Sequence, residues 1–464
     1  MIRLNVLPSK FLFPLTIGVV VLDAIFILLL IYFSKNVVSK IICIVLTLFI
    51  CVASCMGGYY ISKTQNVLSS ITNVAKHAKN TVSVVVKESS SIKNKSQLNG
   101  VSVGSLRLNE QGSKKALKEL SSEGIVLNQT EYDSMTTLLE AFYNGEVDSI
   151  IINESSRSQI LDMEAYSNFD SNTRVVYQTS YKVKNNDSAT SVSDITSKPF
   201  NVLISGSDTR GGFDENGRSD VIMIATVNPK THTILLTSVP RDFYVTTACD
   251  AGDGCMQGAL DKITHTGIHG TNTTKRTVEQ LLGIEINYTF KVGFDTVTKL
   301  VDTLGGVDVT VAPGYAVHNE YINVKEGVNH LYGEEALEYA RERYAYAEGD
   351  RQRTKNQQQV LMGIVKEATK PSVITNYAAI MDTMANTFST TMSNAEITDL
   401  IKYQLNNNPT WKMEQYMVDG TGDTLMCAEL GDAASVMVPD QSTVKMAKDK
   451  INAVLAGKSS EDVK

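Results

Sequence analysis

Two apolar stretches near the N-terminus constrain this chain more than any other feature of its sequence. They cover residues 11–33 and 41–61, and each is long enough to cross a bilayer, which takes about 20 apolar residues. A single cleaved signal peptide does not account for two such stretches, and the sequence has no short apolar region followed by a cleavage site. We therefore expect two transmembrane helices, which make this a multi-pass membrane protein.

Charge around these stretches predicts their orientation. Lys35 and Lys40 lie in the short loop between them, and the positive-inside rule places such a loop in the cytoplasm. Everything after residue 61 is then extracytoplasmic. Arg3 and Lys10 fit this topology poorly, and a further helix upstream of the given start would resolve the conflict. The sequence leaves that alternative open.

The charge of the remaining chain excludes one class of function. The chain of 464 residues has 43 Lys and Arg against 50 Asp and Glu. Residues 1–61 hold four of those cations and one of the anions, which leaves 39 against 49, a balance of −10, for the rest. A general nucleic-acid-binding protein needs a basic face, so we expect no nucleic-acid partner.

Cysteine placement offers one candidate disulfide. Cys249 and Cys255 bracket the segment "DAGDG" in the exported part, where a disulfide can form. A zinc site would need two further ligands, and no matching pair lies nearby. Two alternatives remain: a disulfide that closes this loop, or a pair of free thiols.

The pattern after the membrane region predicts two α/β units separated by a linker. Residues 63–80 are polar and helix-compatible, like a stalk. Strand and helix patterns then alternate up to residue 153, which indicates a small α/β domain with a spacer or docking role. Residues 185–198 are rich in Ser, Asn and Asp and predict a linker.

The second unit predicts a larger α/β domain with a central sheet flanked by helices. The expected strands are 200–206, 220–228, 233–240 and 307–311, and the expected helices are 274–283, 294–305, 333–343, 354–369 and 394–405. The domain boundaries that follow are a membrane anchor over 1–62, an accessory domain over 63–190 and a third domain over 191–464, with its core at 199–370 and a C-terminal extension at 371–464.

Charged residues follow or precede three of these strands. Asp208 follows the first strand, Asp220 precedes the second, and Arg241 follows the third. Ligands of open α/β sheets bind beyond strand ends. The glycine-rich loop between the two acids can fold back, so their carboxylates could share one hard cation such as Mg²⁺ (or Mn²⁺), which binds to one or two carboxylates together with substrate phosphates.

The segment "RERYAYAEGDRQR" concentrates arginine in an acidic chain. Arginine pairs bidentately with phosphate oxygens. Arg341 and Arg343 lie two positions apart, so they can converge with Arg241 on a diphosphate only if the helix ends there, as the following "AEGD" favours. The alternative is a solvated helix end with local ion pairs. His265 and His269 have the spacing of a metal pair, but Gly267 weakens the helix and local hydrogen bonding is the favoured reading.

The larger unit resembles the LytR-CpsA-Psr family of cell-envelope proteins over residues 200–370, and the whole arrangement resembles its capsule-locus members. The matching stretches are "NVLISGSDTR", "GRSDVIMIATVNPKTHTILLTSVPRDFYV", "DKITHTGIHG", "VGFDTVTKLVDTLGGVDVTV", "GVNHLYGEEALEYARERY" and "EGDRQRTKNQQQVL". Those members typically have three membrane spans, so this chain departs from them by one.

The resemblance implies a magnesium-dependent phosphotransferase that moves glycopolymer from a polyprenyl diphosphate carrier onto peptidoglycan. The polymer implied is a capsular polysaccharide, and a polyprenyl pyrophosphatase activity and contact with the capsule synthesis machinery are further expectations. The resemblance implies metal binding by Asp208 and Asp220, catalytic roles for these two acids, Arg241 and Asp350, and substrate binding by Arg218, Arg241, Arg341, Arg343, Arg353 and Gln357.

Two questions remain open at this level. The proton of the attacking hydroxyl could pass to Asp350 or to a carboxylate at the metal. A different class of function is also compatible with the sequence: a non-enzymatic membrane regulator that binds the lipid-linked polymer and controls capsule synthesis, chain length or export.

Overall fold

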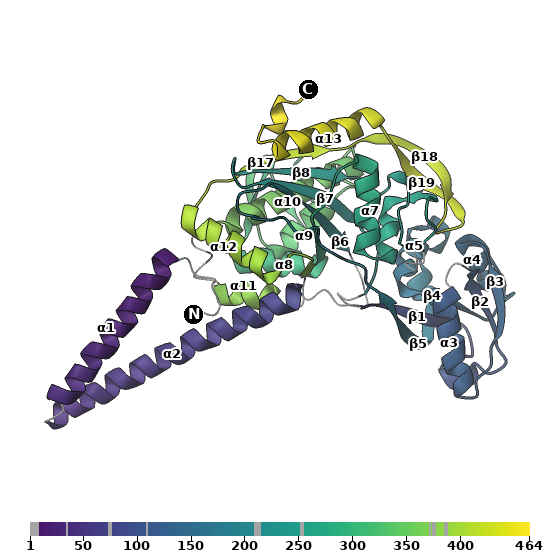
Figure 1. Cartoon of the computed structure of the whole chain (residues 1–464). Helices are drawn as coiled ribbons and strands as arrows, with labels where there is room; N and C mark the ends of the chain where they lie inside the picture. The colour runs from purple at the N-terminus through teal and green to yellow at the C-terminus, as the bar shows by residue number, and fades with distance from the viewer. Residues whose placement is uncertain are drawn as a thin grey trace.

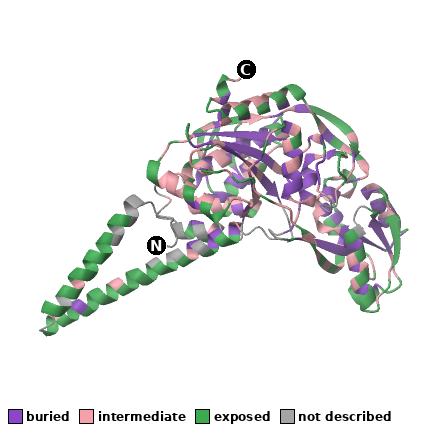
Figure 2. Cartoon of the chain, viewed as in Figure 1, coloured by how far each residue is buried: buried purple, intermediate pink, exposed green. Residues whose placement is uncertain are grey.

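Two long helices extend away from the rest of the molecule (Figure 1). The computed structural model describes residues 9–33, 36–72, 77–107, 110–207, 215–250, 255–370, 373, 377–384 and 388–464. The extended helices are α1 (Ser9–Phe33) and α2 (Val37–Thr72), and their described side chains are mostly exposed (Figure 2). These are the two segments that the sequence predicts as membrane spans.

One of these helices meets the length and composition of a membrane span within the described residues. It is the Val37–Met56 stretch of α2, with a mean hydropathy of 2.5. The apolar stretch found in α1, Ile17–Leu28, is shorter than a bilayer requires. The prediction of two transmembrane helices is therefore supported for the second segment and not confirmed for the first.

The C-terminal turns of α2 pack against the larger domain. Val67, Leu68 and Ile71 are buried there in one cluster with Ile380 and Phe388. The sequence assigns this stretch to a stalk at the start of the accessory domain. In the structure it continues α2 without a break, so the candidate membrane helix is joined rigidly to the larger domain.

The accessory domain is a five-stranded mixed sheet with helices against it. Its strand order is β3-β2-β4-β1-β5, and separate apolar clusters form around Leu138 and Phe142 and around Val84 and Leu120. Its elements are β1 (His77–Lys87), β2 (Ser102–Leu106), α3 (Glu110–Ser122), β3 (Asn128–Tyr132), α4 (Met135–Asn144), β4 (Ser149–Asn153), α5 (Arg157–Asp162), α6 (Phe169–Asn172) and β5 (Thr173–Lys184). The α/β prediction is confirmed here, although β3, β5 and the short helices α5 and α6 were not foreseen.

The larger domain is built on a six-stranded sheet of order β16-β11-β6-β7-β8-β17. Its strands are β6 (Phe200–Ser207), β7 (Val221–Asn228), β8 (Thr233–Val239), β11 (Tyr288–Gly293), β16 (Phe388–Thr390) and β17 (Lys412–Met417). Shorter ribbons are formed by β9 (Tyr244–Thr246), β10 (Leu260–Lys262), β12 (Val307–Val311), β13 (Val317–His318), β14 (Asn323–Val324), β15 (Gly327–Leu331), β18 (Gly420–Cys427) and β19 (Asp432–Pro439). The predicted strand 307–311 is β12, which pairs with β15 outside the main sheet.

Helices cover this sheet. They are α7 (Thr271–Leu282), α8 (Phe294–Leu304), α9 (Gly333–Arg341), α10 (Asp350–Ala368), α11 (Tyr377–Met384), α12 (Asn394–Asn407) and α13 (Gln441–Leu455). Buried side chains of α7 and α13, such as Val278 and Ile451, share a core with Leu235 of β8. Leu361 and Val365 of α10 pack instead with Leu236, whose side chain points to the other face because neighbouring residues of a strand alternate.

One edge of the sheet gathers the strand ends that the sequence marks as charged. Since β6 runs antiparallel to β7, and β7 to β8, the end of β6, the start of β7 and the end of β8 meet, with Gly206 opposite Val221 and Ile222 opposite Val239. The parallel strands β11 and β17 end at the same edge. The predicted convergence of strand ends is confirmed for the described residues.

Of the two alternatives for the cysteine pair, the structure has the disulfide. Cys249 and Cys255 are bonded across the short segment between them. Cys427 is a buried free thiol, and burial is the main cause that raises its pKa, to about 12. The disulfide fits a chain that folds in an oxidising compartment.

Candidate active site

An ion pair between Asp220 and Arg241 lies at the edge of the sheet where the ends of β6 and β8 meet the start of β7. Asp220 precedes β7 and Arg241 follows β8, and the register of these antiparallel strands brings the two together. Arg241 Nη1 donates to Asp220 Oδ1 at 2.9 Å, and the two side chains are only 16% and 14% exposed. Burial disfavours the charge of Arg241, yet Asp220, Asp242 and Asp350 together raise its pKa above the ordinary value. The positive charge of Arg241 is thus held firmly in place.

Arg218 reaches the same carboxylate from the segment before β7. Its Nη2 lies 3.8 Å from Asp220 Oδ1, and its Nη1 donates to Asp162 at 2.5 Å. The backbone of this segment is fixed by a close approach of Gly267. A Cβ on Gly267 would lie 2.5 Å from both Gly217 O and Ser219 Oγ, so no larger residue fits without a shift. Gly267 therefore allows the close packing of the backbone on both sides of Arg218.

The first turn of α10 adds a second buried arginine. The helix begins at Asp350, four residues before the predicted start, and this places Asp350 and Arg353 three residues apart on one turn, where they form an ion pair. Burial, followed by the charges of Arg241 and Arg343, lowers the pKa of Arg353, although Asp350 opposes this. Several cations therefore face one another across a small space.

These arginines keep donors that the described chain does not satisfy. The Nε atoms of Arg218, Arg241 and Arg353 are buried and find no hydrogen-bond acceptor among the described residues. A buried donor left without an acceptor costs about 1–3 kcal/mol. An oxyanion would supply acceptors to all three, and phosphate oxygens match the guanidinium fork. The geometry is that of an anion-binding site.

Arg341 and Arg343 flank this cluster on the loop after α9. The helix ends at Arg341, two residues before the predicted end at residue 343, and Glu342 is extended, so the two arginines do not lie on one helix. Arg341 is half exposed, with its guanidinium 5.7 Å from the ring centre of Phe294 at the start of α8. Arg343 lies against the Tyr344 ring and within range of Arg353. Their convergence on a shared ligand stays a prediction.

Arg351 points away from this cluster. Its Nη2 lies 2.8 Å from Asp419 Oδ1 and donates to Gly420 O at 3.0 Å, at the start of β18. The side chains of Arg351 and Asp419 are both more than one-third exposed. This pair is similar in length to the Arg241–Asp220 pair, 2.8 Å against 2.9 Å, but it is more exposed to solvent, which makes it a natural internal control.

The proposed metal ligands are only partly described. Asp208 lies outside the described residues. Asp220 Oδ1 faces Arg241 and Arg218, whereas its Oδ2 makes no ion pair or hydrogen bond in the described part of the chain. One available carboxylate oxygen beside this arginine cluster suits Mg²⁺, which keeps few protein ligands. No group of three or more metal-ligating side chains occurs among the described residues. Gln357 is half-buried on α10, and its substrate contact stays a prediction.

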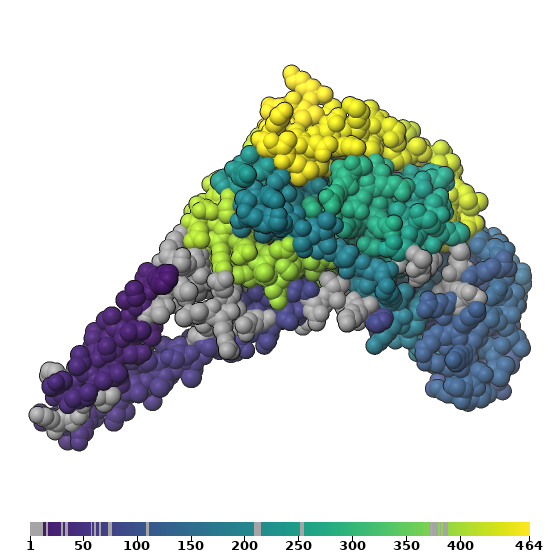
Figure 3. Space-filling model, in the orientation of Figure 1, coloured from purple at the N-terminus to yellow at the C-terminus, as the bar shows by residue number. Residues whose placement is uncertain are grey.

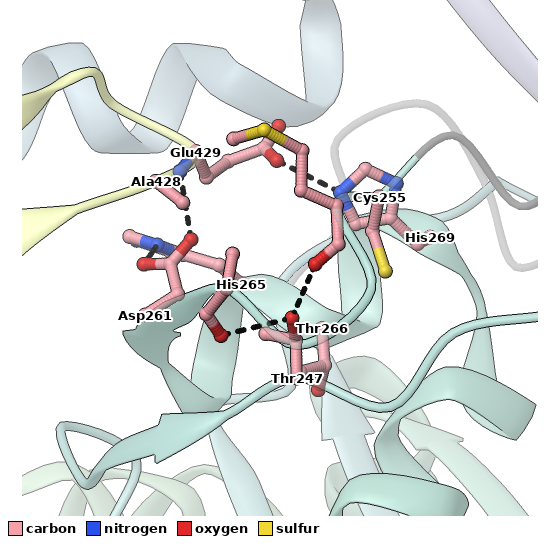
Figure 4. A pocket seen from close by; sticks show the side chains of 10 residues that line it. Thr247, Cys255, Asp261, His265, Thr266, His269, Ala428 and Glu429 are labelled. Carbon is pink, nitrogen blue, oxygen red and sulfur yellow. Dashed lines mark hydrogen bonds and ion pairs between the residues drawn. The ribbon is translucent and has the colours of Figure 1, made fainter.

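The two histidines with metal-like spacing are held by carboxylates instead. His265 Nδ1 lies 2.7 Å from Asp261 Oδ1, and His269 Nε2 lies 2.8 Å from Glu429 Oε2 (Figure 4). They line a small pocket beside Cys255. The favoured reading, local hydrogen bonding, is confirmed.

Three further charged residues contact the arginines of the candidate site or one another but were given no role from the sequence: Asp242, Lys262 and Asp162. Asp242 follows Arg241, with its Oδ2 3.8 Å from Arg241 Nε, and Lys262 Nζ lies 3.4 Å from Asp242 Oδ1. The acid after Arg241 was visible in "TSVPRD" but had no assigned role. Asp162 comes from the accessory domain, and no local pattern points to it.

This chain is similar to known proteins over more than half of its length. Residues 165–453 match the LytR_cpsA_psr family. The polyisoprenyl-teichoic acid–peptidoglycan teichoic acid transferase TagU of Bacillus cereus (strain AH820) is 30% identical over 241 residues, which cover 51% of this chain and 76% of that protein. TagU of Bacillus subtilis (strain 168) is 36% identical over 196 residues, covering 42% of this chain and 60% of that protein.

A solved structure is also similar. Protein gbs0355 from Streptococcus agalactiae shares 26% sequence identity, with 56% of this chain and 89% of that chain covered and a TM-score of 0.48. The family match begins at residue 165, inside the accessory domain, and extends well into the C-terminal extension.

Proposed function

Since this chain belongs to the LytR-CpsA-Psr family, we propose that it is a membrane-anchored phosphotransferase that moves a glycopolymer from a polyprenyl diphosphate carrier onto peptidoglycan. The observation that carries the proposal is the set of buried arginine Nε donors that find no hydrogen-bond acceptor among the described residues. The names of the TagU relatives describe a reaction of this kind for those proteins.

The arginines would bind the diphosphate and stabilise the charge that develops during transfer. Arg241 and Arg353 are fixed by Asp220 and Asp350, so their guanidinium groups need no reorientation when the substrate arrives. Such preorganised charge is the main source of catalysis in phosphoryl transfer. Arg218, Arg341 and Arg343 would complete the binding surface.

The bond changes follow from this placement. A hydroxyl oxygen of peptidoglycan attacks the phosphorus nearer the glycan, a new phosphate ester forms, and the bond to the bridging oxygen breaks. Polyprenyl monophosphate leaves with the electron pair of that bond. We propose that Asp350 accepts the hydroxyl proton, because it is the described carboxylate that belongs to the same helical turn as Arg353.

Mg²⁺ is part of the proposal. Asp208 and the Oδ2 atom of Asp220 would hold it, and it would neutralise charge on the phosphate oxygens. The capsular nature of the polymer is the finer part and rests on the likeness to capsule-locus members. A lipid-linked teichoic acid offered beside a lipid-linked capsular polysaccharide would decide between them, and faster transfer of the teichoic acid would refute the capsular assignment.

The function is tested by adding a polyprenyl-diphosphate-linked polysaccharide to the full chain in detergent. We expect release of polyprenyl monophosphate that depends on added peptidoglycan. A non-enzymatic regulator would bind the lipid and release nothing. Release that does not require peptidoglycan would indicate a pyrophosphatase in place of a transferase.

We also propose that the domains after α2 are extracytoplasmic, as the loop lysines and the disulfide favour. Single cysteines placed at positions 36 and 190, in a chain without its free cysteines, report on this topology. We expect a membrane-impermeant thiol reagent to label position 190 in intact cells and to miss position 36. The reverse pattern would disprove the orientation.

A further inference from the structure

The accessory domain is attached to the larger domain at two places besides the linker. The tip of the β18–β19 hairpin meets the start of α4, where Leu430 O accepts from Met135 N at 3.0 Å and Asp432 Oδ2 accepts from Thr136 N at 3.0 Å. Figure 3 shows this hairpin in contact with the accessory domain. Lys79 Nζ pairs with buried Glu215 at 3.3 Å. The two domains therefore hold a defined arrangement.

A third contact reaches the candidate active site itself. Asp162, the last residue of α5, pairs with Arg218 Nη1 at 2.5 Å. The positive charges of Arg218, Arg241 and Lys262 together outweigh burial and lower the pKa of Asp162. An accessory-domain carboxylate thus lies in the positive field where the proposed substrate would place its phosphates.

Local structure presents Asp162 at this position. Arg157 at the start of α5 is buried, and its guanidinium bonds both oxygens of Glu154 at 2.6 and 2.8 Å and Asp170 at 3.0 Å. This network anchors the short helix. An acid at the C-terminal end of a helix is disfavoured by the helix dipole. The ion pair with Arg218 therefore accounts for the position of Asp162, because the dipole of α5 does not stabilise a carboxylate at the end of that helix.

We infer that Asp162 is a residue of the candidate site contributed by the accessory domain, where it competes with an anionic substrate for Arg218 and sets how tightly the site holds a diphosphate. This inference rests on the proposed function and adds a determinant of substrate affinity to it. Asp162 is 55% exposed, so it can return to solvent when a phosphate takes its place. Arg218, only 11% exposed, would then keep an anionic partner throughout.

Replacement of Asp162 by a phosphate on Arg218 couples diphosphate binding to the docking of the accessory domain. A diphosphate that displaces Asp162 removes one of the contacts that the described residues make between the domains. By linkage, if diphosphate binding weakens the docking of the accessory domain by some factor, docking weakens diphosphate binding by that same factor. The accessory domain would then adjust affinity at the site as well as act as a spacer.

The test compares binding of inorganic pyrophosphate to the full chain and its variants by calorimetry. Asp162→Asn removes the competing charge, and we expect it to bind pyrophosphate about five- to tenfold more tightly, as suits loss of one partly exposed ion pair. Asp162→Glu keeps the charge and should bind like the wild type. Glu88→Gln is the matched control, because Glu88 is 56% exposed and pairs with Arg174 at 2.8 Å within the accessory domain.

The increase in pyrophosphate affinity caused by Asp162→Asn should be smaller at high salt. Salt screens the charge of Asp162 in the wild type, so its removal then matters less. A purely structural role for Asp162 predicts unchanged or weaker binding in Asp162→Asn, and either result would overturn the inference while leaving the proposed function intact. An equal gain in Asp162→Glu would overturn it too. Failure of the wild type and all variants to bind pyrophosphate would overturn both the inference and the proposed function.

Discussion

Replacing Arg241 by lysine is expected to weaken binding of a polyprenyl diphosphate by about 2–5 kcal/mol, the cost of disrupting a desolvated hydrogen-bonded charge. Lysine keeps the positive charge but loses the planar fork that pairs with two oxygens. Arg241 is the best-held cation of the site, with Asp220 at 2.9 Å and little exposure, so a point charge cannot reproduce its contacts. The measurement is a binding titration on the full chain.

Arg351→Lys is the control for this experiment. Arg351 belongs to the same domain and pairs with Asp419 at 2.8 Å, but it is 45% exposed. An exposed pair contributes about 0–1 kcal/mol, so this variant should bind nearly as the wild type does. Arg341→Lys and Arg343→Lys should weaken binding clearly if both forks contact the diphosphate. Equal behaviour of all four variants would indicate a general basic surface and would rule out a clamp.

Asp220→Ala is expected to impair both the fold and the metal site. Removing one partner of a buried pair costs about 3–5 kcal/mol, because Arg241 keeps its charge without its closest carboxylate. Turnover that depends on Mg²⁺ should disappear as well, together with the Mg²⁺ binding that calorimetry detects in the presence of pyrophosphate. Denaturant unfolding measures the first effect and calorimetry the second.

Two companion variants separate these effects. Asp419→Ala breaks the exposed pair with Arg351 and should cost at most about 1 kcal/mol of unfolding free energy. Asp220→Asn restores an oxygen acceptor for Arg241 without the charge, so it should recover part of the stability and none of the metal binding. Retained Mg²⁺ binding in Asp220→Asn would exclude Asp220 as a ligand.

Local patterns in the sequence were enough to place the candidate residues that adjoin predicted strands. Asp220 and Arg241 adjoin strands with strong apolar patterns, and antiparallel pairing of adjacent strands brings such ends together. The helix expected over 333–343 ends at Arg341, and the sequence named such an end only as the condition for two arginines two positions apart to reach one ligand. Asp350 and Arg353 were identified through family resemblance, whereas their ion pair became visible only when α10 proved to start at Asp350.

Features set by long-range contacts were not predictable in the same way. Asp162 meets Arg218 across 56 residues and two domains, and nothing in its own neighbourhood marks it as a site residue. Strand β11 joins the sheet through parallel pairing with β6, and its short "YTFKVG" was not identified as a strand, although Tyr288, Phe290 and Val292 alternate with more polar residues. The stability role of Asp220 also depends on its pairing with Arg241, which the sequence did not reveal.

The central claim is that the glycan-linked phosphate is transferred intact to peptidoglycan, and the direct test follows that phosphate. A donor is prepared with radioactive phosphorus only at the position nearer the sugar and is incubated with the full chain and peptidoglycan. We predict that the label enters the peptidoglycan fraction, that unlabelled polyprenyl monophosphate is released, and that Arg241→Lys slows both while Arg351→Lys does not. Label that stays on the lipid, or that appears as soluble glycan phosphate without entering peptidoglycan, would contradict the proposed transfer.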